Sequence, residues 1–240
     1  MKKFTSILLI ILFSIHFNIS VAGTDGSNEL TLKKNTNSND VKDCFEKLNR
    51  GVFAFNKGLD NILFKPLAKG YRVLPNPLKS ATSNVLTNIS NVVTIPNNLL
   101  QGQIKNAGLN SLRLVINSTL GIFGIFDVAS YYGIEKIDKE DYGQTLGYWG
   151  VGEGCYLVLP VLGPSTLRDT LGSLVNFTGG DAWYNVTVNN DTRYFGDFDY
   201  YASKVSAGVD FRAKNYDSIE NLEKNSIDFY ASVKSLYLQD

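Results

Sequence analysis

Residues 141–169 read DYGQTLGYWGVGEGCYLVLPVLGPSTLRD, and this stretch carries the most distinctive strand and turn signals of the chain. Thr145–Trp149 and Cys155–Leu159 are two short β-prone runs around a glycine-rich turn, which predicts a β-hairpin. Pro164 and Ser165 then predict the start of a helix, with the Ser165 side chain as its N-cap. The glycines of the turn lack the strand-to-helix setting that a nucleotide-binding loop needs.

The segment before this predicted hairpin, GIFGIFDVASYYG at 121–133, is apolar, aromatic and punctuated by glycine. Gly121, Gly124 and Gly133 permit backbone conformations that other residues avoid, and Asp127 is the only charge among them. Such a segment is either a movable gate with glycine hinges or a tight turn between packed elements.

Amphipathic helices are predicted on both sides of this central region. The first begins near Asp43 and carries apolar residues at steps of three and four until Pro66 breaks it. Its apolar stripe consists of Phe45, Leu48, Val52, Phe55, Leu59 and Ile62. The stripe fits an ordinary core helix and a helix lying in a membrane interface equally well.

The same spacing of apolar residues predicts four more helices. Asn76 followed by Pro77 is a favourable start for one of them, and a second runs from about Gln103 to Thr119. In the second, Ile104, Ala107, Leu112 and Val115 are expected to face inward. The other apolar positions are Leu78, Ala81, Val85, Ile89 and Val92, then Tyr194, Phe198, Tyr201, Val205 and Val209, and finally Ile219, Leu222, Tyr230, Val233 and Tyr237.

The N-terminus predicts export. Two lysines precede a short apolar run, and small side chains at Ser20 and Ala22 precede the expected cleavage point, so residues 1–22 are interpreted as a secretory signal peptide. An uncleaved N-terminal anchor is the alternative. Residues 23–42 are polar and predict a flexible linker, which leaves one helical domain over 43–240.

Composition excludes several classes of protein. The one histidine, His16, lies in the predicted signal peptide, so the mature chain lacks Ser-His-Asp and Cys-His catalysis. Two cysteines are too few for a thiolate metal cage, and we expect no metal and no cofactor. Without Lys2 and Lys3, 21 basic residues stand against 23 acidic ones, a balance that argues against nucleic acid. After the signal peptide, no apolar stretch is long enough for a membrane-spanning helix.

The ordered set of motifs resembles the MlaA (VacJ) family of outer-membrane lipid-asymmetry proteins. The matching motifs are Glu46 with Asn49-Arg50 and Phe53–Asn56, Lys65–Ala68, Tyr71-Arg72, NNLLQG at 97–102, RLVINSTLGIFGIFD at 113–127, the stretch 141–169 quoted above, and Arg212-Ala213. They cover nearly all of the chain after the linker.

The resemblance implies a mainly α fold, a ring-like bundle of amphipathic helices with a small β-hairpin in the middle. It also implies a phospholipid transport protein on the periplasmic side of the outer membrane. Such a protein removes mislocalised phospholipids from the outer leaflet and passes them through an amphipathic channel to a soluble periplasmic lipid carrier. Association with a trimeric porin is implied as well.

Two other functions compete with this one. A soluble periplasmic lipid-binding or porin-linked scaffold without a channel is the first. A lipid hydrolase is the second, but the chain has no G-x-S-x-G elbow and no mature histidine, so we expect no enzyme.

The resemblance also selects candidate site residues. Gly121, Gly124, Asp127 and Gly133 form the candidate gating loop. Candidates for the hairpin and lipid path are Gly143, Gln144, Trp149, Gly150, Gly152, Pro160, Gly163, Arg168 and Asp169. Arg168 has two open roles, contact with a lipid phosphate or an ion pair that holds the fold.

The chain departs from the family pattern at two places. Family members carry a cysteine directly after the cleavage point, where this chain has Gly23 and Thr24, so no acyl anchor is expected there. Cys44 and Cys155 each stand where the family has proline. A disulfide between them in the oxidising periplasm is one hypothesis, and two separate buried thiols are the other.

Overall fold

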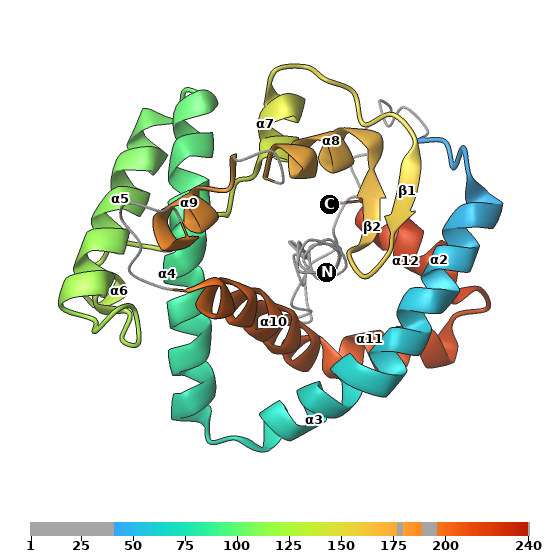
Figure 1. Cartoon of the computed structure of the whole chain (residues 1–240), viewed down its shortest axis with the longest axis horizontal. Coiled ribbons are helices and arrows are strands. Elements are labelled where there is room, and N and C mark those ends of the chain that lie inside the picture. The colour runs from blue at the N-terminus through green and yellow to red at the C-terminus, as the bar shows by residue number, and fades with distance from the viewer. Residues whose placement is uncertain (1–40, 177–179, 189–195, 240) are drawn as a thin grey trace, which may run out of the picture.

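The computed structural model describes residues 41–176, 180–188 and 196–239; the predicted signal peptide and most of the predicted linker lie outside them. The elements are α2 (Glu46–Leu59), η1 (Asp60–Phe64), α3 (Lys65–Val73), α4 (Asn76–Leu100), α5 (Ile104–Thr119), α6 (Val128–Tyr131), α7 (Tyr142–Tyr148), β1 (Tyr156–Leu159), β2 (Gly163–Thr166), α8 (Leu167–Val175), α9 (Ala182–Val188), α10 (Asp197–Lys214), α11 (Tyr216–Asn225) and α12 (Phe229–Tyr237). Figure 1 shows the elements arranged as a ring. The predicted fold class, a helical ring with a small hairpin, is confirmed.

The first arm of the ring is continuous through Pro66, so the prediction that Pro66 ends the helix is wrong. Proline has no backbone N–H to donate, and its ring crowds the carbonyl four residues earlier. Here the chain widens into the π-helical turn η1 directly before α3 and accommodates Pro66 in the first turn of α3. The helix therefore bends and continues (Figure 1).

A hairpin forms, but only one of its two predicted strands is confirmed: Cys155–Leu159 corresponds to β1, and the partner strand is β2. β1 pairs antiparallel with β2, with Tyr156 opposite Thr166 and Leu159 opposite Gly163. The helix that follows is capped by Thr166, whose Oγ1 accepts a hydrogen bond from the backbone N–H of Asp169 at 3.2 Å. The prediction that Pro164 and Ser165 open this helix, with Ser165 as cap, is therefore wrong, since both residues lie in β2.

The predicted strand Thr145–Trp149 is wrong as well, because these residues form most of α7 and its C-cap. The cause is a capping box. The Asp141 carboxylate accepts a hydrogen bond from the backbone N–H of Gln144 at 2.8 Å, and the Gln144 side chain accepts one from the backbone N–H of Asp141 at 3.3 Å. This reciprocal cap fixes a helix start just before the β-prone residues and overrides their local preference.

The crossing of α7 and α8 depends on two glycines. A Cβ added to Gly172 would lie 2.3 Å from the backbone nitrogen of Gly143, a distance that real Cβ contacts do not reach. The two backbones therefore touch directly, which only glycine permits.

We expect Gly172→Ala to lower the free energy of unfolding by about 1–3 kcal/mol, because the two helices must move apart. Thermal unfolding followed by circular dichroism measures the change. Gly108→Ala on α5 is the matched control. Nothing lies within 4 Å of a Cβ at that position, and alanine there should be neutral or stabilising. Equal effects of the two substitutions would contradict the close crossing.

α4 and α5 pack through polar side chains rather than apolar ones. α4 begins at Asn76 as predicted, although the Asn76 side chain forms no cap bond. Of the α5 residues predicted to face inward, only Ala107 is buried, whereas Ile104, Leu112 and Val115 are exposed. The inward face instead carries Ala107, Asn110, Arg113 and Asn117. This burial is possible because the amides bond to each other, as where Asn110 Nδ2 donates to Asn98 Oδ1 at 2.9 Å.

The late helices close the ring. α10 matches the first late helix from Asp197 onward, and Tyr194 lies outside the described residues. The second predicted late helix is divided into α11 and α12, because Asp228 caps α12 by accepting a hydrogen bond from the backbone N–H of Ala231 at 3.1 Å. Arg212 of α10 donates to both carboxylate oxygens of Asp60 at 2.9 and 3.0 Å, which joins α10 to η1.

Asparagine side chains of α2 bind the backbone of the hairpin. Asn49 donates to the carbonyl of Tyr156 at 3.0 Å and accepts from the N–H of Val158 at 2.9 Å. Two helical turns later, Asn56 bonds in the same way to Leu159 and Val161, at 2.9 and 2.7 Å. The two side-chain amides thus form hydrogen bonds that a neighbouring strand would otherwise form with the hairpin backbone. The buried aromatic residues Tyr156 and Tyr230 pack behind it.

Candidate functional site

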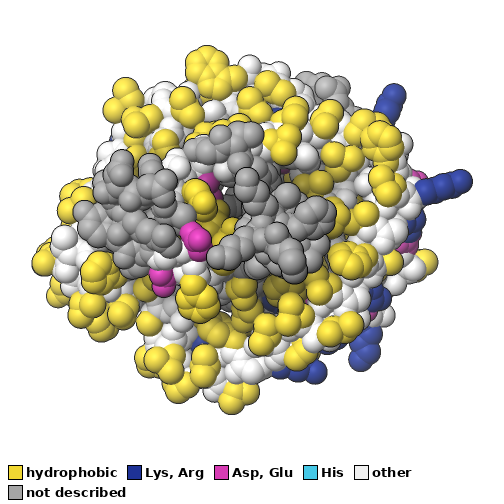
Figure 2. All heavy atoms as spheres, in the orientation of Figure 1, with side chains coloured by type: hydrophobic (Ala, Val, Ile, Leu, Met, Phe, Trp, Pro, Cys, Tyr) yellow, Lys and Arg dark blue, Asp and Glu magenta, His cyan; other side chains and the backbone are white. Residues whose placement is uncertain are grey.

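Large hydrophobic side chains are exposed around the ring. Four of the six residues of the predicted stripe on α2 and η1 are exposed, with Ile62 at 81 %. The core-helix interpretation of that stripe is therefore wrong for this structure. Other exposed residues are Leu67, Val73 and Leu78 on α3 and α4, Ile104, Leu112 and Val115 on α5, Phe123, Phe126, Tyr131 and Tyr132 after α5, Tyr148 and Trp149 at the end of α7, and Leu167, Leu171 and Leu174 on α8. Figure 2 shows hydrophobic side chains around the rim of the molecule.

The buried side chains are mostly polar. Asparagine alone supplies Asn49, Asn88, Asn91, Asn97, Asn98, Asn110, Asn117 and Asn215, each at most 7 % exposed. In a protein surrounded by water, large hydrophobic side chains are mostly buried and asparagines are mostly exposed, which is the reverse of this distribution. Exposed apolar surface of this extent marks contact with an apolar partner or a membrane. In the described part of the chain, no helix is both long and apolar enough to span a bilayer.

Charge is divided between two sides of the ring. Over residues 76–134 the charged residues are Lys79, Lys105, Arg113 and Asp127, and the last two are buried against each other. Ion pairs instead join α2, η1 and α3 to the late helices and the turn before α12; they are Arg50–Asp228, Lys57–Glu223, Lys65–Glu220, Arg72–Asp217 and Arg212–Asp60. Figure 2 shows lysine and arginine gathered on that side. The wall made by α4, α5 and α6 therefore carries few charges.

Asp127, one of the predicted gating-loop residues, holds a buried polar cluster. Its carboxylate accepts hydrogen bonds from Arg113 at 2.8 Å, Asn117 at 3.1 Å and the Ser130 hydroxyl at 2.7 Å. The Arg113 side chain is 2 % exposed and also donates to the carbonyl of Ile134. Burial acts to raise the pKa of Asp127, but the hydrogen bonds and the charges of Lys136 and Arg113 hold it well below its usual range.

The glycines of the same loop lie in a compact turn. Gly124 has φ +93° and its N–H donates to the carbonyl of Asn117 at 2.8 Å, while the N–H of Phe126 donates to the carbonyl of Gly121 at 2.9 Å. A Cβ on Gly121 would lie 2.2 Å from the Phe126 carbonyl oxygen. Gly133 has φ +79° and follows α6. The segment is a tight turn in this structure, and its movement as a gate stays a prediction.

The predicted residues of the 143–152 region form the ends of α7. Gly143 touches α8, and Gln144 completes the capping box. At the other end, Trp149 is 69 % exposed and its indole N–H donates to the carbonyl of Leu100 at 3.1 Å. Gly150 has φ +85° just after the helix, and a Cβ on Gly152 would meet nothing within 4 Å. Each position has a structural reason for its residue type except Gly152, for which the structure offers none.

The remaining candidates surround the hairpin. Pro160 lies in its turn, and Gly163 begins β2 with φ +85°. Arg168 Nε donates to Asp169 at 3.0 Å, and Arg168 Nη1 lies 4.0 Å from Glu153. Asp169 also accepts a hydrogen bond from the Tyr237 hydroxyl at 2.5 Å. Arg168 therefore forms ion pairs in this structure, and its contact with a lipid phosphate stays a prediction.

Cys44 and Cys155 are joined by a disulfide in the structure, with their Cα atoms 5.6 Å apart and a sequence separation of 111. The bond links the segment before α2 to the residue before β1, beside the hydrogen bonds of Asn49. The disulfide therefore links the chain just after the predicted linker to the hairpin.

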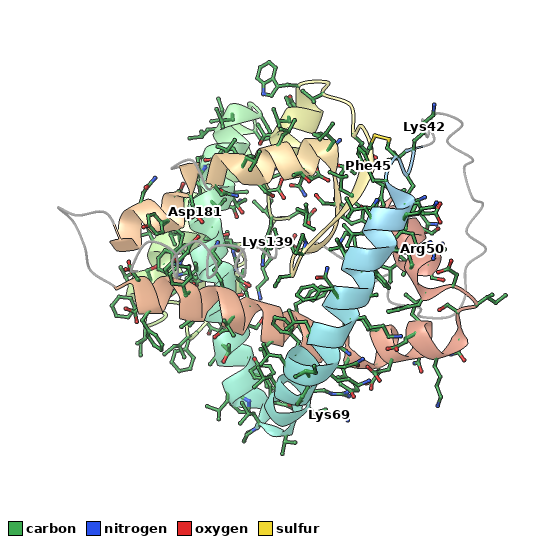
Figure 3. All side chains as sticks on the ribbon, turned by 45° about the vertical axis from the view of Figure 1, so that its right-hand side comes forward. Lys42, Phe45, Arg50, Lys69, Lys139 and Asp181 are labelled. Atoms are coloured by element: carbon green, nitrogen blue, oxygen red, sulfur yellow. A yellow bond between two sulfur atoms is a disulfide. The ribbon has the colours of Figure 1, made fainter. Side chains whose placement is uncertain are left out.

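Sequence reasoning missed a lysine inside the ring. Residues 134–141 form neither a helix nor a strand, and their charge-rich sequence IEKIDKED resembles a solvated loop. Figure 3 nevertheless shows Lys139 in the space that the helices enclose. Asp141, two residues later, has its pKa raised by burial and by the carboxylates of Asp169 and Glu140. No local pattern distinguishes these residues, because only the path of the chain through the ring places them there.

Comparison with protein families gives one match over nearly the whole described chain. The family described as MlaA lipoprotein matches residues 41–240. An uncharacterised protein of Rickettsia prowazekii is 37 % identical over 198 residues, which cover 82 % of this chain and 75 % of the relative.

Two further proteins add a described function and a solved fold. The intermembrane phospholipid transport system lipoprotein MlaA of Haemophilus influenzae is 31 % identical over 213 residues, covering 85 % of this chain and 82 % of the relative. A solved structure described as "Structural basis for maintenance of bacterial outer membrane lipid asymmetry" superposes with a TM-score of 0.67 at 29 % identity. It covers 82 % of this chain and 96 % of that structure's chain.

Proposed function

The chain belongs to the MlaA lipoprotein family, and we propose that it removes mislocalised phospholipids from the outer leaflet of the outer membrane and passes them inward to maintain lipid asymmetry. The observation that carries the proposal is the inverted distribution of polarity, an apolar exterior around buried amides. The names of the relatives support a phospholipid as the substrate class.

The ring suits this work for a physical reason. Moving a charged headgroup through hydrocarbon costs several kcal/mol because the charge loses its water. Fixed dipoles lining a passage replace that water, while the acyl chains stay in contact with lipid or apolar walls. No covalent bond needs to break, so the proposal requires no catalytic residue.

The exterior also supplies a means of membrane attachment. Residues such as Ile62, Phe123 and Tyr131 are exposed on different parts of the ring and would be costly to hold in water. We propose that this surface holds the protein in the membrane interface without an acylated cysteine at the start of the mature chain. We propose that the protein associates with a trimeric porin and passes the lipid to a soluble periplasmic lipid carrier.

Deletion of the gene tests the proposal. Loss of the protein should raise the amount of phospholipid exposed at the cell surface and increase sensitivity to detergent, and the wild-type gene supplied in trans should reverse both. Enzymatic labelling of surface phospholipid in intact cells measures the first effect. Unchanged surface phospholipid in the deletion strain would sink the proposal. Release of the protein from outer membranes by a high-salt wash would favour a peripheral scaffold instead.

A further inference from the structure

The turn between α5 and α6 exposes only apolar side chains. Residues 120–126 read LGIFGIF, and this apolar turn has no polar or charged side chain. Leu120, Ile122, Phe123 and Phe126 are all exposed, with Phe123 at 72 %. Figure 1 places α5 and α6 at the outer edge of the ring, and Figure 2 shows hydrophobic side chains along that edge. The apolar turn therefore presents large hydrophobic side chains at the periphery of the molecule.

The backbone of the apolar turn is strained. Ile122 has φ +51° and Phe123 has φ +55°, in the left-handed region that few residues other than glycine adopt and that suits a β-branched residue least. Gly124 follows with φ +93°. Such conformations persist only where surrounding contacts impose them, and they concentrate at functional positions. The fold therefore enforces the conformation that exposes Ile122 and Phe123.

The two long helices of this wall hold the apolar turn in place. Asn84 of α4 donates from Nδ2 to the carbonyl of Ile125 at 3.2 Å. A Cβ on Gly124 would lie 2.7 Å from the Cβ of Asn88, so the turn also packs directly on α4. Asp127, the next residue after the turn, is bonded to two side chains of α5. The turn is thus attached to both helices while its hydrophobic side chains remain outside.

The backbone amides of the apolar turn already have partners. The N–H groups of Phe123, Gly124, Ile125 and Phe126 donate to carbonyls of residues 117–122, at distances between 2.8 and 3.2 Å. An unpaired polar group that enters an apolar medium is costly, whereas these amides keep their bonds on leaving water. Protein interfaces, in contrast, carry about one hydrogen bond per 100–200 Å². A surface without polar side chains and with its amides already bonded fits lipid better than a protein partner.

The residues that follow the apolar turn become steadily more polar. Tyr131 and Tyr132, at the end of α6, are exposed and stack edge to face with their ring centroids 5.7 Å apart. Further along, the half-exposed Lys136 pairs with Asp127 at 3.2 Å. Tyrosine favours the level of the lipid headgroups, and lysine places its charge in water. The order of these residues along the chain thus matches the order of acyl chains, headgroups and water.

We propose that the apolar turn inserts into the bilayer to the level where the acyl chains begin, while Tyr131 and Tyr132 stay among the headgroups. The inference rests on the proposed function, because it assumes that the ring lies in the outer membrane. It adds an orientation, since the edge formed by α5 and α6 enters the lipid.

The opposite side of the ring provides a control (Figure 1). Ile227, in the turn before α12, is the most exposed of the large hydrophobic residues at 108 %. Its neighbour Asp228 forms an ion pair with Arg50 at 2.7 Å. Because a charged pair loses its hydration in lipid, Ile227 should stay in water although it is apolar.

Depth-dependent fluorescence quenching tests the proposal. Phe123→Cys, Tyr132→Cys and Ile227→Cys are each labelled with the fluorophore NBD in the unreduced mature chain, and the wild type, whose cysteines are bonded to each other, is the blank. Vesicles of phosphatidylethanolamine and phosphatidylglycerol carry a nitroxide either on the headgroup or near the start of the acyl chain. Position 123 should lose most of its fluorescence to the acyl-chain nitroxide, and position 132 should lose most to the headgroup nitroxide. Position 227 should respond only to iodide in the water.

Partition into the same vesicles gives a second measurement without a label. Phe123→Ser should lower the partition coefficient about tenfold, because one large hydrophobic side chain no longer leaves water. Ile227→Ser is the matched control and should partition as the wild type does. Melting temperatures of the variants within about 2 °C of the wild type show that the fold is retained.

The outcomes separate this inference from the proposed function. Vesicle binding with position 123 open to iodide would overturn the insertion and leave lipid transport standing. Protection of position 123 from iodide and from both nitroxides would mean that protein covers the turn, which would overturn it as well. Failure of the wild type to bind vesicles would also overturn the insertion, and together with normal surface phospholipid in the deletion strain it would reject the proposed function too.

Discussion

Asp127→Asn should lower the free energy of unfolding by about 3–5 kcal/mol, because it removes the charge that compensates the buried Arg113. Arg113 is 2 % exposed, so water cannot replace the lost partner. For a domain of this size the loss corresponds to a fall in Tm of roughly 6–20 °C. Thermal unfolding in detergent, followed by circular dichroism, measures it.

Two controls isolate this interaction. Lys136→Ala removes a half-exposed cation from the same carboxylate and should cost no more than about 1 kcal/mol. Arg113→Met combined with Asp127→Asn removes both buried charges and should restore part of the stability. Asp127→Asn with the Tm of the wild type would show that the pair does not hold the loop.

The same carboxylate makes stability depend on pH. Because the pKa of Asp127 is lowered in the folded chain, the unfolded chain binds the proton more readily. The stabilisation is therefore complete above the unfolded pKa of about 4 and is lost as the pH falls below it. Asp127→Asn should remove this part of the acid sensitivity.

Loss of the disulfide between Cys44 and Cys155 should cost about 2–5 kcal/mol. The bond closes a long loop, because the two cysteines have a sequence separation of 111, and so restricts the unfolded chain strongly. Dithiothreitol should lower the Tm of the wild type and have no effect on a Cys44→Ala, Cys155→Ala double variant.

Each single variant should match the double variant, because either change removes the bond. Asn49 and Asn56 still join α2 to the hairpin in all three, so the ring should retain its helical content. Titration of two free thiols in the unreduced, denatured wild type would contradict the prediction.

The sequence predicted the main elements of this fold where local signals were unopposed. The starts of α4 and α5 and the strand β1 follow from helical periodicity, the Asn76-Pro77 pair and a β-prone run. It failed where a distant or reciprocal contact outweighed a local preference. Residues 145–148 are helical because Asp141 and Gln144 cap the start of α7. The first helix continues through Pro66 because a π-helical turn directly precedes α3.

The candidate site was less accessible to sequence reasoning. The family motifs identified Asp127, Arg168 and Asp169 as residues worth testing, but not their partners. Lys139 gave no signal at all, since its place in the ring depends on Glu140 binding Thr94 and Gln101 of another element. Contacts between residues about 40 positions apart have no local pattern.

The sequence by itself determined which residues are apolar and how they repeat along each helix. It could not determine which face of a helix is buried, because periodicity is the same whether a stripe points inward or outward. Tertiary structure decided that question. The asparagines of α4 and α5 can bond to each other only when the helices pair through them, and the hydrophobic stripes are then left on the outside of the ring.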